Sequence, residues 1–291
     1  MARDYEGVVI RPPSEAGSFL LQVTGGCSHN RCTFCLTYKY AKFSTRPFES
    51  IREDIDLVAR VNRGVKRVFM CDGNAMCLPT GDLCRILDHL SNSFPDLERV
   101  GVYTNADDIL AKTPEELSML HEKKLSIGYL GLESGNDAIL ERVKKGATAD
   151  EMVRAVIKAQ EAGIEMSVIV LLGLGSREMS RQHAVDSARA VSRMNPRYLS
   201  ALTLMLLPGT PLYRDYTNGG FEIMDPVSIL QELRWLVEAV EVDGCTFRTN
   251  HASNYLPVGG VMSRERERIL EVIDRGLREP SLLRPESYRA L

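Results

Sequence analysis

Short apolar runs alternate with amphipathic runs along most of the chain. The apolar runs have the length of buried strands, and the amphipathic runs place apolar residues every three to four positions, as helices do. Strands that alternate with helices predict a parallel sheet with right-handed crossovers. The expected strands are residues 19–24, 67–71, 100–104, 126–131, 165–172 and 198–206. The expected helices are residues 48–62, 80–93, 113–123, 149–162 and 180–194.

The number of strand–helix units decides the expected fold class. The six units are two short of a complete eight-unit barrel, so we expect an α/β fold, a partial (β/α)6 TIM-like barrel. A helix at residues 226–241, a strand at 245–249 and a helix at 264–278 are then expected to close it. We divide the chain into a core, residues 1–215, and a C-terminal α/β extension, residues 216–291, that closes the barrel and contributes to the substrate site.

Composition and charge narrow the class of protein. Hydrophobic residues make up 44% and charged residues 26% of the 291 residues, which is typical of globular chains. The net charge of −3 gives no general attraction to phosphate backbones, so there is no strong sign of nucleic-acid binding. Residues 1–6 lack the apolar segment of a secretory signal, and the apolar runs are too short to span a bilayer. We therefore expect a cytoplasmic protein with no membrane partner and no disulfide framework.

Three cysteines crowd into one short segment directly after the first expected strand. Cys27, Cys32 and Cys35 are separated by four and two intervening residues. Three thiolates can each bind one iron of a [4Fe–4S] cubane and leave the fourth iron open to another ligand. A structural zinc site with His29 as its fourth ligand, or a set of ordinary buried thiols, are the alternatives. Zinc sites usually pair two CxxC knuckles, and only Cys32 and Cys35 have that spacing, so the sequence favours the cluster.

Polar residues also follow two later strands. Asp72, Gly73 and Asn74 follow the second expected strand, and Glu133 and Ser134 follow the fourth. Carbonyl and side-chain oxygens suit an ammonium group, and a carboxylate can accept from two hydroxyls. Each segment has a simpler interpretation, since Asp-Gly-Asn is a common turn sequence and a serine often caps a helix.

These segments resemble the radical S-adenosylmethionine (SAM) superfamily. In that family three cysteines hold the cluster and an aromatic residue precedes the last one, a position that Phe34 fills. Four residues separate Cys27 from Cys32 where the family usually has three. Residues 129–146 are similar to the subgroup that contains coproporphyrinogen dehydrogenase, Elp3-like proteins and the methylthiotransferases. The resemblance thus implies two cofactors, a [4Fe–4S] cluster and SAM.

The resemblance also implies which residues bind SAM. The segment of Asp72, Gly73 and Asn74 corresponds to the loop that receives the amino group of SAM. Glu133 and Ser134 are expected to bind its ribose.

Two further SAM contacts follow from the same resemblance. Lys145 corresponds to a basic residue that meets the SAM carboxylate, although a lysine also suits the end of a helix because of the helix dipole. Leu172 lies in a stretch that resembles the one beside the adenine, although a strand followed by a loop explains this stretch almost as well.

A dense group of polar residues follows the last expected strand. Arg248 and His251 are candidate catalytic residues, because an arginine fork can fix an anionic group and a histidine can move protons. Asn250, Asn254 and Tyr255 are candidate substrate ligands. The alternative interpretation is an asparagine-rich turn with a surface histidine.

The resemblance implies an enzyme that cleaves SAM reductively and uses the 5′-deoxyadenosyl radical to abstract hydrogen from a substrate. After residue 206 the chain is similar to uncharacterised radical SAM proteins near the magnesium-protoporphyrin cyclase family, here without the cobalamin domain. The charge balance favours a small-molecule substrate, and a flavodoxin or ferredoxin is the expected electron donor. The alternatives are an RNA- or peptide-modifying enzyme and a non-catalytic protein that binds the cluster and SAM.

Overall fold

The computed structural model describes residue 5 and residues 7–290. The prediction of no secretory signal concerns residues 1–6, which lie outside the described residues apart from Tyr5. The chain forms two compact units that interleave along the sequence. Among the described residues, the first unit consists of those up to residue 30 and of residues 37–130 and 155–166, and the second consists of residues 31–36, 131–154 and 167–290. The division at residue 215 into a core and an extension stays a prediction.

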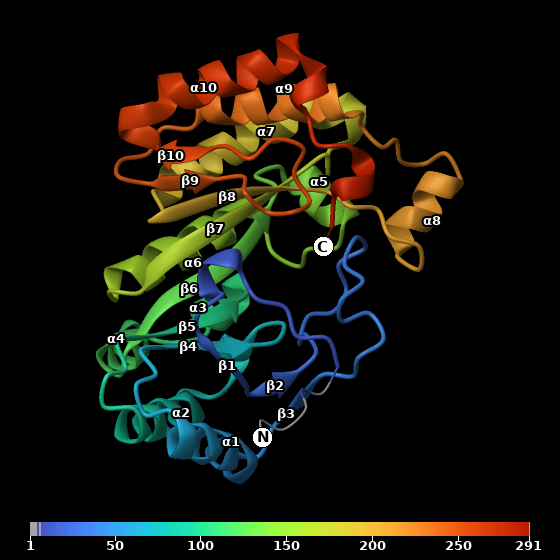
Figure 1. Ribbon diagram of the computed structural model, residues 1–291. Helices are drawn as coiled ribbons and strands as arrows, with labels where there is room; N and C mark the ends of the chain where they lie inside the picture. The colour runs from blue at the N-terminus through green and yellow to red at the C-terminus, as the bar shows by residue number, and fades with distance from the viewer. Residues whose placement is uncertain (1–4, 6, 291) are drawn as a thin grey trace. The chain divides into compact units, whose positions relative to one another are not determined.

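Eight strands form the main sheet among the described residues. They are β1 (Phe19–Gln22), β4 (Arg67–Cys71), β5 (Arg99–Thr104), β6 (Leu125–Glu133), β7 (Glu165–Leu172), β8 (Tyr198–Thr203), β9 (Thr246–Arg248) and β10 (Gly259–Val261). Their order is β1-β4-β5-β6-β7-β8-β9-β10 (Figure 1). The pairs β1–β4, β4–β5, β5–β6, β7–β8 and β8–β9 are parallel, and β10 runs antiparallel to β9. The predicted α/β class with a parallel sheet is confirmed.

Three short strands were not predicted. The strands β2 (Thr24–Gly25) and β3 (Ser44–Thr45) form a separate antiparallel pair, and β10 adds an edge to the main sheet. Strands of two or three residues are too short to show an alternating pattern of burial. The six strands predicted for the core are all present, and β4 and β7 have the predicted bounds.

The predicted helices are present as well. They are α1 (Phe48–Val61), α2 (Thr80–Ser93), α4 (Pro114–Glu122), α6 (Ala149–Glu161), α7 (Ser176–Met194), α9 (Pro226–Ala239) and α10 (Met262–Arg278). The short helices α3 (Ala106–Leu110), α5 (Asp137–Arg142) and α8 (Pro211–Thr217) were missed because fewer than two or three turns carry little periodicity. Single 3₁₀ turns lie at Pro13–Glu15, Ala75–Cys77, Pro280–Leu282 and Glu286–Tyr288.

The first unit has strands that are buried on both faces. In β4, Val68, Phe69 and Met70 are fully buried, as expected of a parallel strand covered by helices. The helices α1 and α2 lie side by side (Figure 1). In α4 the Thr113 hydroxyl accepts from the Glu116 amide at 3.2 Å, and the Glu116 carboxylate accepts from the Thr113 amide at 2.7 Å. This capping box fixes where the helix begins.

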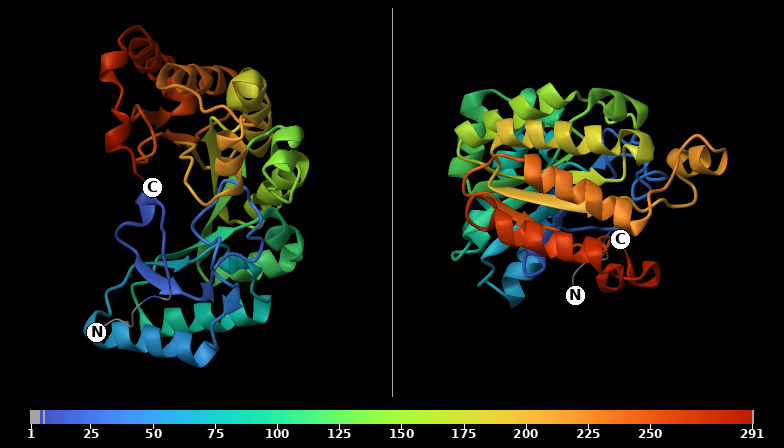
Figure 2. Two further views of the ribbon diagram at one scale, coloured as in Figure 1. Left: turned by 90° about the vertical axis from the view of Figure 1, so that its right-hand side faces the viewer. Right: turned by 90° about the horizontal axis from the view of Figure 1, so that it is seen from above.

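The second unit stacks three helices in a row. Figure 2 shows α7, α9 and α10 side by side in the view from above, and α9 contacts both of the others. The edge strand β10 is protected by the first turns of α10. The Val261 amide donates to Glu265 Oε2 at 2.7 Å, and Arg268 Nη2 donates to the Gly259 carbonyl at 2.8 Å. Two outward backbone groups of this edge are therefore occupied, which disfavours pairing with another chain.

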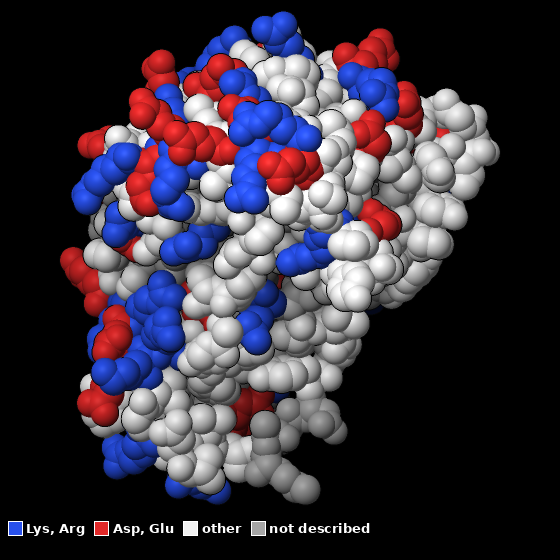
Figure 3. Space-filling view, turned by 45° about the horizontal axis from the view of Figure 1, so that its top comes forward, with Lys and Arg blue, Asp and Glu red and all other residues white. Residues whose placement is uncertain are grey.

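The surface carries both signs of charge. Figure 3 shows Lys and Arg side chains interspersed with Asp and Glu over the upper and left parts of the face that it displays. On α10, for example, Arg268 pairs with Glu265, and Arg275 pairs with Glu279 directly after the helix. Within the part of the chain that the structure describes, no helix is both long and apolar enough to cross a membrane.

Candidate cofactor site

The cysteine loop follows the short strand β2. Cys27, Cys32 and Cys35 are all partly exposed. Cys27 belongs to the first compact unit, whereas Cys32 and Cys35 belong to the second. Among the described residues, no group of three or more His, Cys, Asp or Glu side chains is placed to hold a metal ion. Each half of the loop is held in place by its own hydrogen bonds and packing contacts.

The first half of the loop is packed against the segment after β4. The Gly73 amide donates to the Gly26 carbonyl at 3.0 Å. A Cβ atom on Gly73 would lie 2.5 Å from both Cα and Cβ of Cys27, a distance that real contacts do not reach. Only glycine permits this approach. Since β1 and β4 are parallel neighbours, the segments after their carboxyl ends meet, and Gly73 shapes the position of Cys27.

Asn74 holds the same half of the loop with its side chain. Its Oδ1 accepts from the Ser28 amide at 3.0 Å, and its Nδ2 donates to Ser28 Oγ at 2.7 Å and to Asp108 Oδ2 at 2.9 Å. Asn74 is fully buried, and burial raises the pKa of Asp108 to about 6. The amide of Asn74 thus joins the residue after Cys27 to the start of α3.

Asp72 is also held inside the first unit. It is buried, it accepts a hydrogen bond from Gln22, and its φ of 76° lies in the left-handed region that non-glycine residues rarely adopt. A backbone turned in this way directs the carbonyl groups of the segment differently from a regular strand end. That Asp72, Gly73 and Asn74 bind the amino group of SAM stays a prediction.

The second half of the loop is held by α5 and α8. The Thr33 amide donates to the Val143 carbonyl at 2.9 Å, and the Thr33 carbonyl accepts from the Leu212 amide at 3.0 Å. Phe34 packs against a buried apolar cluster that includes Leu171. The aromatic residue before the last cysteine is therefore an anchor for the loop within the second unit. The cluster consists of Ile139, Val143, Leu171, Leu174, Leu212 and Phe221.

Glu133 and Lys145 form an ion pair at the end of β6. Lys145 Nζ lies 3.1 Å from Glu133 Oε1, and the two side chains are 12% and 13% exposed. A Cβ on Gly131 would lie 2.1 Å from Glu133 Oε1, so the carboxylate folds back over a glycine. The structure thus brings together the two residues predicted to meet the ribose and the carboxylate of SAM. The Glu133 carboxylate and the Lys145 ammonium are both mostly shielded from water, and each can bind a ligand group that carries the complementary charge or hydrogen-bonding capacity.

Ser134 faces the interior of the second unit. Its hydroxyl lies 2.8 Å from His183 Nδ1 and accepts from the Asn136 amide at 3.0 Å. Ser134 is fully buried, and the cap of α5 is Asn136, whose side chain accepts from the Ile139 amide at 3.2 Å. The simpler interpretation of Ser134 as a helix cap is therefore wrong. Its predicted contact with the ribose stays a prediction.

Leu172 ends β7 and is buried. The next residue, Gly173, has a φ of 85° and donates its amide to Glu232 Oε1 at 2.7 Å. Sequence reasoning missed both His183 and Glu232. The signal for His183 is the spacing of Ser180, His183 and Ser187, which places three polar residues on the same face of the helix as Ala184 and Val191.

The polar segment after β9 is divided between surface and interior. Arg248 and Asn250 are exposed. His251 is partly buried, its Nδ1 lies 2.9 Å from Ser253 Oγ, and burial lowers its pKa. A neutral imidazole at neutral pH can accept a proton as well as donate one. The structure does not bring Arg248 and His251 into a contact that would join them in one catalytic group.

Asn254 and Tyr255 are engaged inside the second unit. Asn254 Nδ2 donates to the Ala201 carbonyl at 2.8 Å and to the Thr249 carbonyl at 3.0 Å, and its Oδ1 accepts from Thr203 Oγ1 at 2.9 Å. Both N–H groups of this amide are used. Asn254 therefore joins the ends of β8 and β9.

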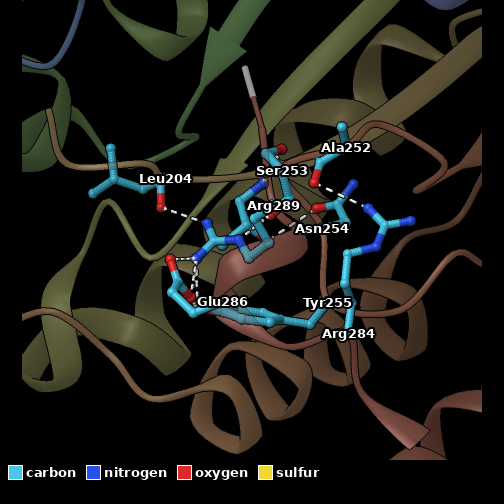
Figure 4. Close-up of polar contacts among 9 residues, drawn as sticks. Leu204, Ala252, Ser253, Asn254, Tyr255, Arg284, Glu286 and Arg289 are labelled. Atoms are coloured by element: carbon cyan, nitrogen blue, oxygen red, sulfur yellow. Dashed lines mark hydrogen bonds and ion pairs between the residues drawn. The ribbon is translucent and has the colours of Figure 1, made fainter.

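A C-terminal arginine completes this region (Figure 4). Arg289 donates to the Leu204 carbonyl at 3.1 Å, to the Ser253 carbonyl at 2.6 Å and to Glu286 at 2.7 Å. Its guanidinium also lies 4.2 Å from the ring centroid of Tyr255, whose hydroxyl donates to Glu286 at 2.7 Å. The segment near residue 289 is thus fastened to the residue that follows β8.

The chain is similar in sequence to a known protein family. The profile of the Radical SAM superfamily matches residues 21–188. The tRNA-2-methylthio-N(6)-dimethylallyladenosine synthase of Psychrobacter cryohalolentis is 25% identical over 217 residues, which cover 69% of this chain and 41% of that protein. The synthase of the same name from Hydrogenovibrio crunogenus is 24% identical over 215 residues, covering 69% and 43%. The chain thus spans about two-fifths of the length of these relatives.

Solved structures share the fold. Coproporphyrinogen III oxidase (HemN) from Escherichia coli, described as a radical SAM enzyme, superposes with a TM-score of 0.59 at 17% identity, covering 76% of this chain and 52% of that one. Methylornithine synthase (PylB) superposes with a TM-score of 0.55 at 16% identity, covering 91% and 81%. These likenesses confirm the predicted partial TIM-like barrel fold.

Proposed function

We propose that this chain, which belongs to the radical SAM superfamily of enzymes, cleaves SAM reductively and takes a hydrogen atom from a small-molecule substrate. Members of the superfamily use a [4Fe–4S] cluster together with SAM and need an electron donor. When bound, this pair supplies a 5′-deoxyadenosyl radical, because one electron splits SAM into methionine and that radical. A flavodoxin or ferredoxin is the donor that we propose, in the reducing environment of the cytoplasm.

Cys27, Cys32 and Cys35 are the residues that we propose to hold the cluster. Three thiols match the three irons that need a protein ligand. The observation that carries this assignment is the fit between Gly73 and Cys27, because a loop held with no room for a methyl group has a defined position of the Cys27 backbone and Cβ. Thr33 and Phe34 fix the half of the loop that carries the other two thiols.

Glu133 and Lys145 are the residues that we propose to bind SAM itself. The carboxylate can accept from the ribose hydroxyls, and the ammonium can donate to the SAM carboxylate. Their mutual ion pair holds both side chains near the end of β6 until SAM binds. The buried Leu172 offers an apolar contact for adenine.

At the substrate end we propose the segment that contains Arg248, Asn250, His251, Asn254 and Tyr255. His251 is suited to proton transfer because burial disfavours its charged form. The exposed Arg248 can fix an anionic substrate group. Since Asn254 is used internally, its contribution is to hold the segment in place.

RNA modification is the second candidate function. The relatives reported above are named as synthases of a modified adenosine in tRNA. The mixed charge of the displayed surface gives this candidate no electrostatic support, because RNA binding depends on clustered Lys and Arg. An assay of SAM consumption with tRNA and with pooled metabolites separates the two candidates.

Iron and sulfide analysis tests the cluster. Anaerobic reconstitution should give about four irons and four sulfides for one cubane, and replacement of Cys27, Cys32 or Cys35 by Ala should abolish the cluster signal in electron paramagnetic resonance. Cys84→Ala is the matched control, because Cys84 is also partly exposed and lies in α2. Zinc alone at the three cysteines would refute the proposal.

A further inference from the structure

Two ionisable side chains are fully buried in the second unit without a role in the chemistry proposed above. His183 lies in α7 and Glu232 lies in α9, and neither is exposed to solvent. Burial of such groups is unfavourable unless hydrogen bonds compensate for the lost water. The hydrogen-bond partners of His183 and Glu232 therefore show which segments these two side chains hold.

Glu232 holds the backbone after β7. Its Oε1 accepts from the Gly173 amide at 2.7 Å, and its Oε2 accepts from the Ser180 hydroxyl. Gly173 is in the left-handed region, and a Cβ there would lie 2.8 Å from Ile229 Cδ1 in the same helix as Glu232. The stretch proposed to lie beside adenine is thus fastened to α9 by a carboxylate and by close packing.

His183 links that stretch to the end of β6. Its Nδ1 lies 2.8 Å from Ser134 Oγ, and its Nε2 lies 3.1 Å from the Leu171 carbonyl and 3.6 Å from Glu232 Oε1. Ser134 directly follows Glu133, and Leu171 directly precedes Leu172. One imidazole therefore spans the two segments to which we assign the ribose and the adenine.

The helix α7 is also packed tightly against the end of β6. A Cβ on Gly135 would lie 2.2 Å from the Asp186 carbonyl oxygen, and the Gly135 amide donates to Ser187 Oγ at 2.9 Å. Asn136 Nδ2 donates to Asp186 Oδ2 at 2.7 Å. The segment after Glu133 therefore has little freedom to move relative to α7.

We infer that His183 and Glu232 are positioning residues that set the spacing between the ribose-binding and adenine-binding segments. The inference rests on the proposed function, because it takes Glu133 and Leu172 as SAM contacts. Glu232 lies in the extension that the sequence assigns to the substrate. The extension thus also shapes the SAM site.

The experiment compares Glu232→Ala and His183→Ala with Glu232→Gln and a control. Glu15→Ala is the matched control, because Glu15 is equally buried and bonded to Arg99 and Tyr129 within the first unit. Hydrogen exchange of the cofactor-free proteins is measured first. Glu232→Ala should speed exchange at residues 172–176, His183→Ala should speed it at residues 133–136 as well, and Glu15→Ala should leave both segments unchanged.

SAM affinity of the reconstituted proteins is measured next by equilibrium dialysis. We expect both alanine variants to bind SAM about ten-fold more weakly, the size of effect typical of residues that orient the ligands of a site. Glu232→Gln should restore most of the affinity, because its amide oxygen can still accept from Gly173.

Glu133→Ala separates the two possible failures. If Glu133→Ala leaves SAM affinity unchanged, the proposed function of this site is wrong. If Glu133→Ala weakens SAM binding while folded Glu232→Ala and His183→Ala retain wild-type affinity and exchange, the positioning role alone is refuted.

Discussion

Gly73→Ala is the substitution that tests how the cysteine loop is held. The added methyl group would lie 2.5 Å from Cα and Cβ of Cys27 and 2.7 Å from the Gly26 carbonyl oxygen. Ordinary contact begins at 3.4 Å, so the two segments must separate by about 0.9 Å. Two of the three atoms belong to the backbone, and a change of side-chain rotamer cannot relieve the overlap.

Two effects lower the free energy of unfolding, the steric overlap and the loss of a hydrogen bond. Overpacking in a filled interior costs about 1–3 kcal/mol, and the hydrogen bond from Gly73 to Gly26 contributes about 1 kcal/mol. We expect Gly73→Ala to lower the free energy of unfolding by about 2–4 kcal/mol. A displacement of about 1 Å is also enough to disable a ligand site, so the iron content after reconstitution should fall below that of the wild type.

The assays are urea denaturation of the cluster-free protein and iron analysis after anaerobic reconstitution. Gly81→Ala is the control, because no atom lies within 4 Å of the Cβ position and the residue lies in α2. That variant should be as stable as the wild type or more stable by about 0.5–1 kcal/mol. A Gly73→Ala protein with wild-type stability and full iron content would refute the account of the loop.

Three further predictions concern other parts of the molecule. Glu133→Ala should weaken SAM binding at least ten-fold and leave the iron content unchanged, as measured by dialysis and iron analysis; unchanged affinity would remove the assignment. Burial raises the Asp108 pKa from 3.8 to about 6, so the folded state holds this proton more tightly, and the resulting stability, about 3 kcal/mol, is present below pH 3.8 and lost as the pH rises through about 6. Asp108→Asn should remove that component from the pH dependence of urea denaturation, and an unchanged profile would contradict it. Asn254→Ala leaves three buried partners without a hydrogen bond and should cost about 2–4 kcal/mol; a loss below about 0.5 kcal/mol would show that Asn254 does not join β8 and β9.

The long elements could be predicted from the sequence because each has several periods of its pattern. The strands β4 and β7 have the predicted bounds, and α7 begins earlier than predicted only because its first turn, Ser176 to Met179, is mostly polar. The helices α3, α5 and α8 could not be predicted in this way, because they consist of five to seven residues. Whether such short helices form depends on long-range packing, which a local sequence pattern does not show.

The candidate site could be predicted only in part. Cys27, Cys32 and Cys35 lie close together in the sequence, and three such closely spaced thiols indicate a cluster site without any knowledge of the fold. The contacts of Asn74 and Asn254 depend on residues far away in the chain, so the sequence indicated polar groups without showing that both amides are used internally. Glu232 was missed for the same reason, since a glutamate in an amphipathic helix is usually on the solvated face.

We propose that the chain cleaves SAM reductively at a cluster held by three cysteines. The most direct measurement is the formation of 5′-deoxyadenosine from SAM by the anaerobically reconstituted protein with dithionite as the electron source. We predict that the wild type and Cys84→Ala form 5′-deoxyadenosine and methionine in equal amounts, and that Cys27→Ala, Cys32→Ala and Cys35→Ala form neither. A wild-type protein that carries a full cluster and binds SAM, yet forms no 5′-deoxyadenosine under these conditions, would contradict the account.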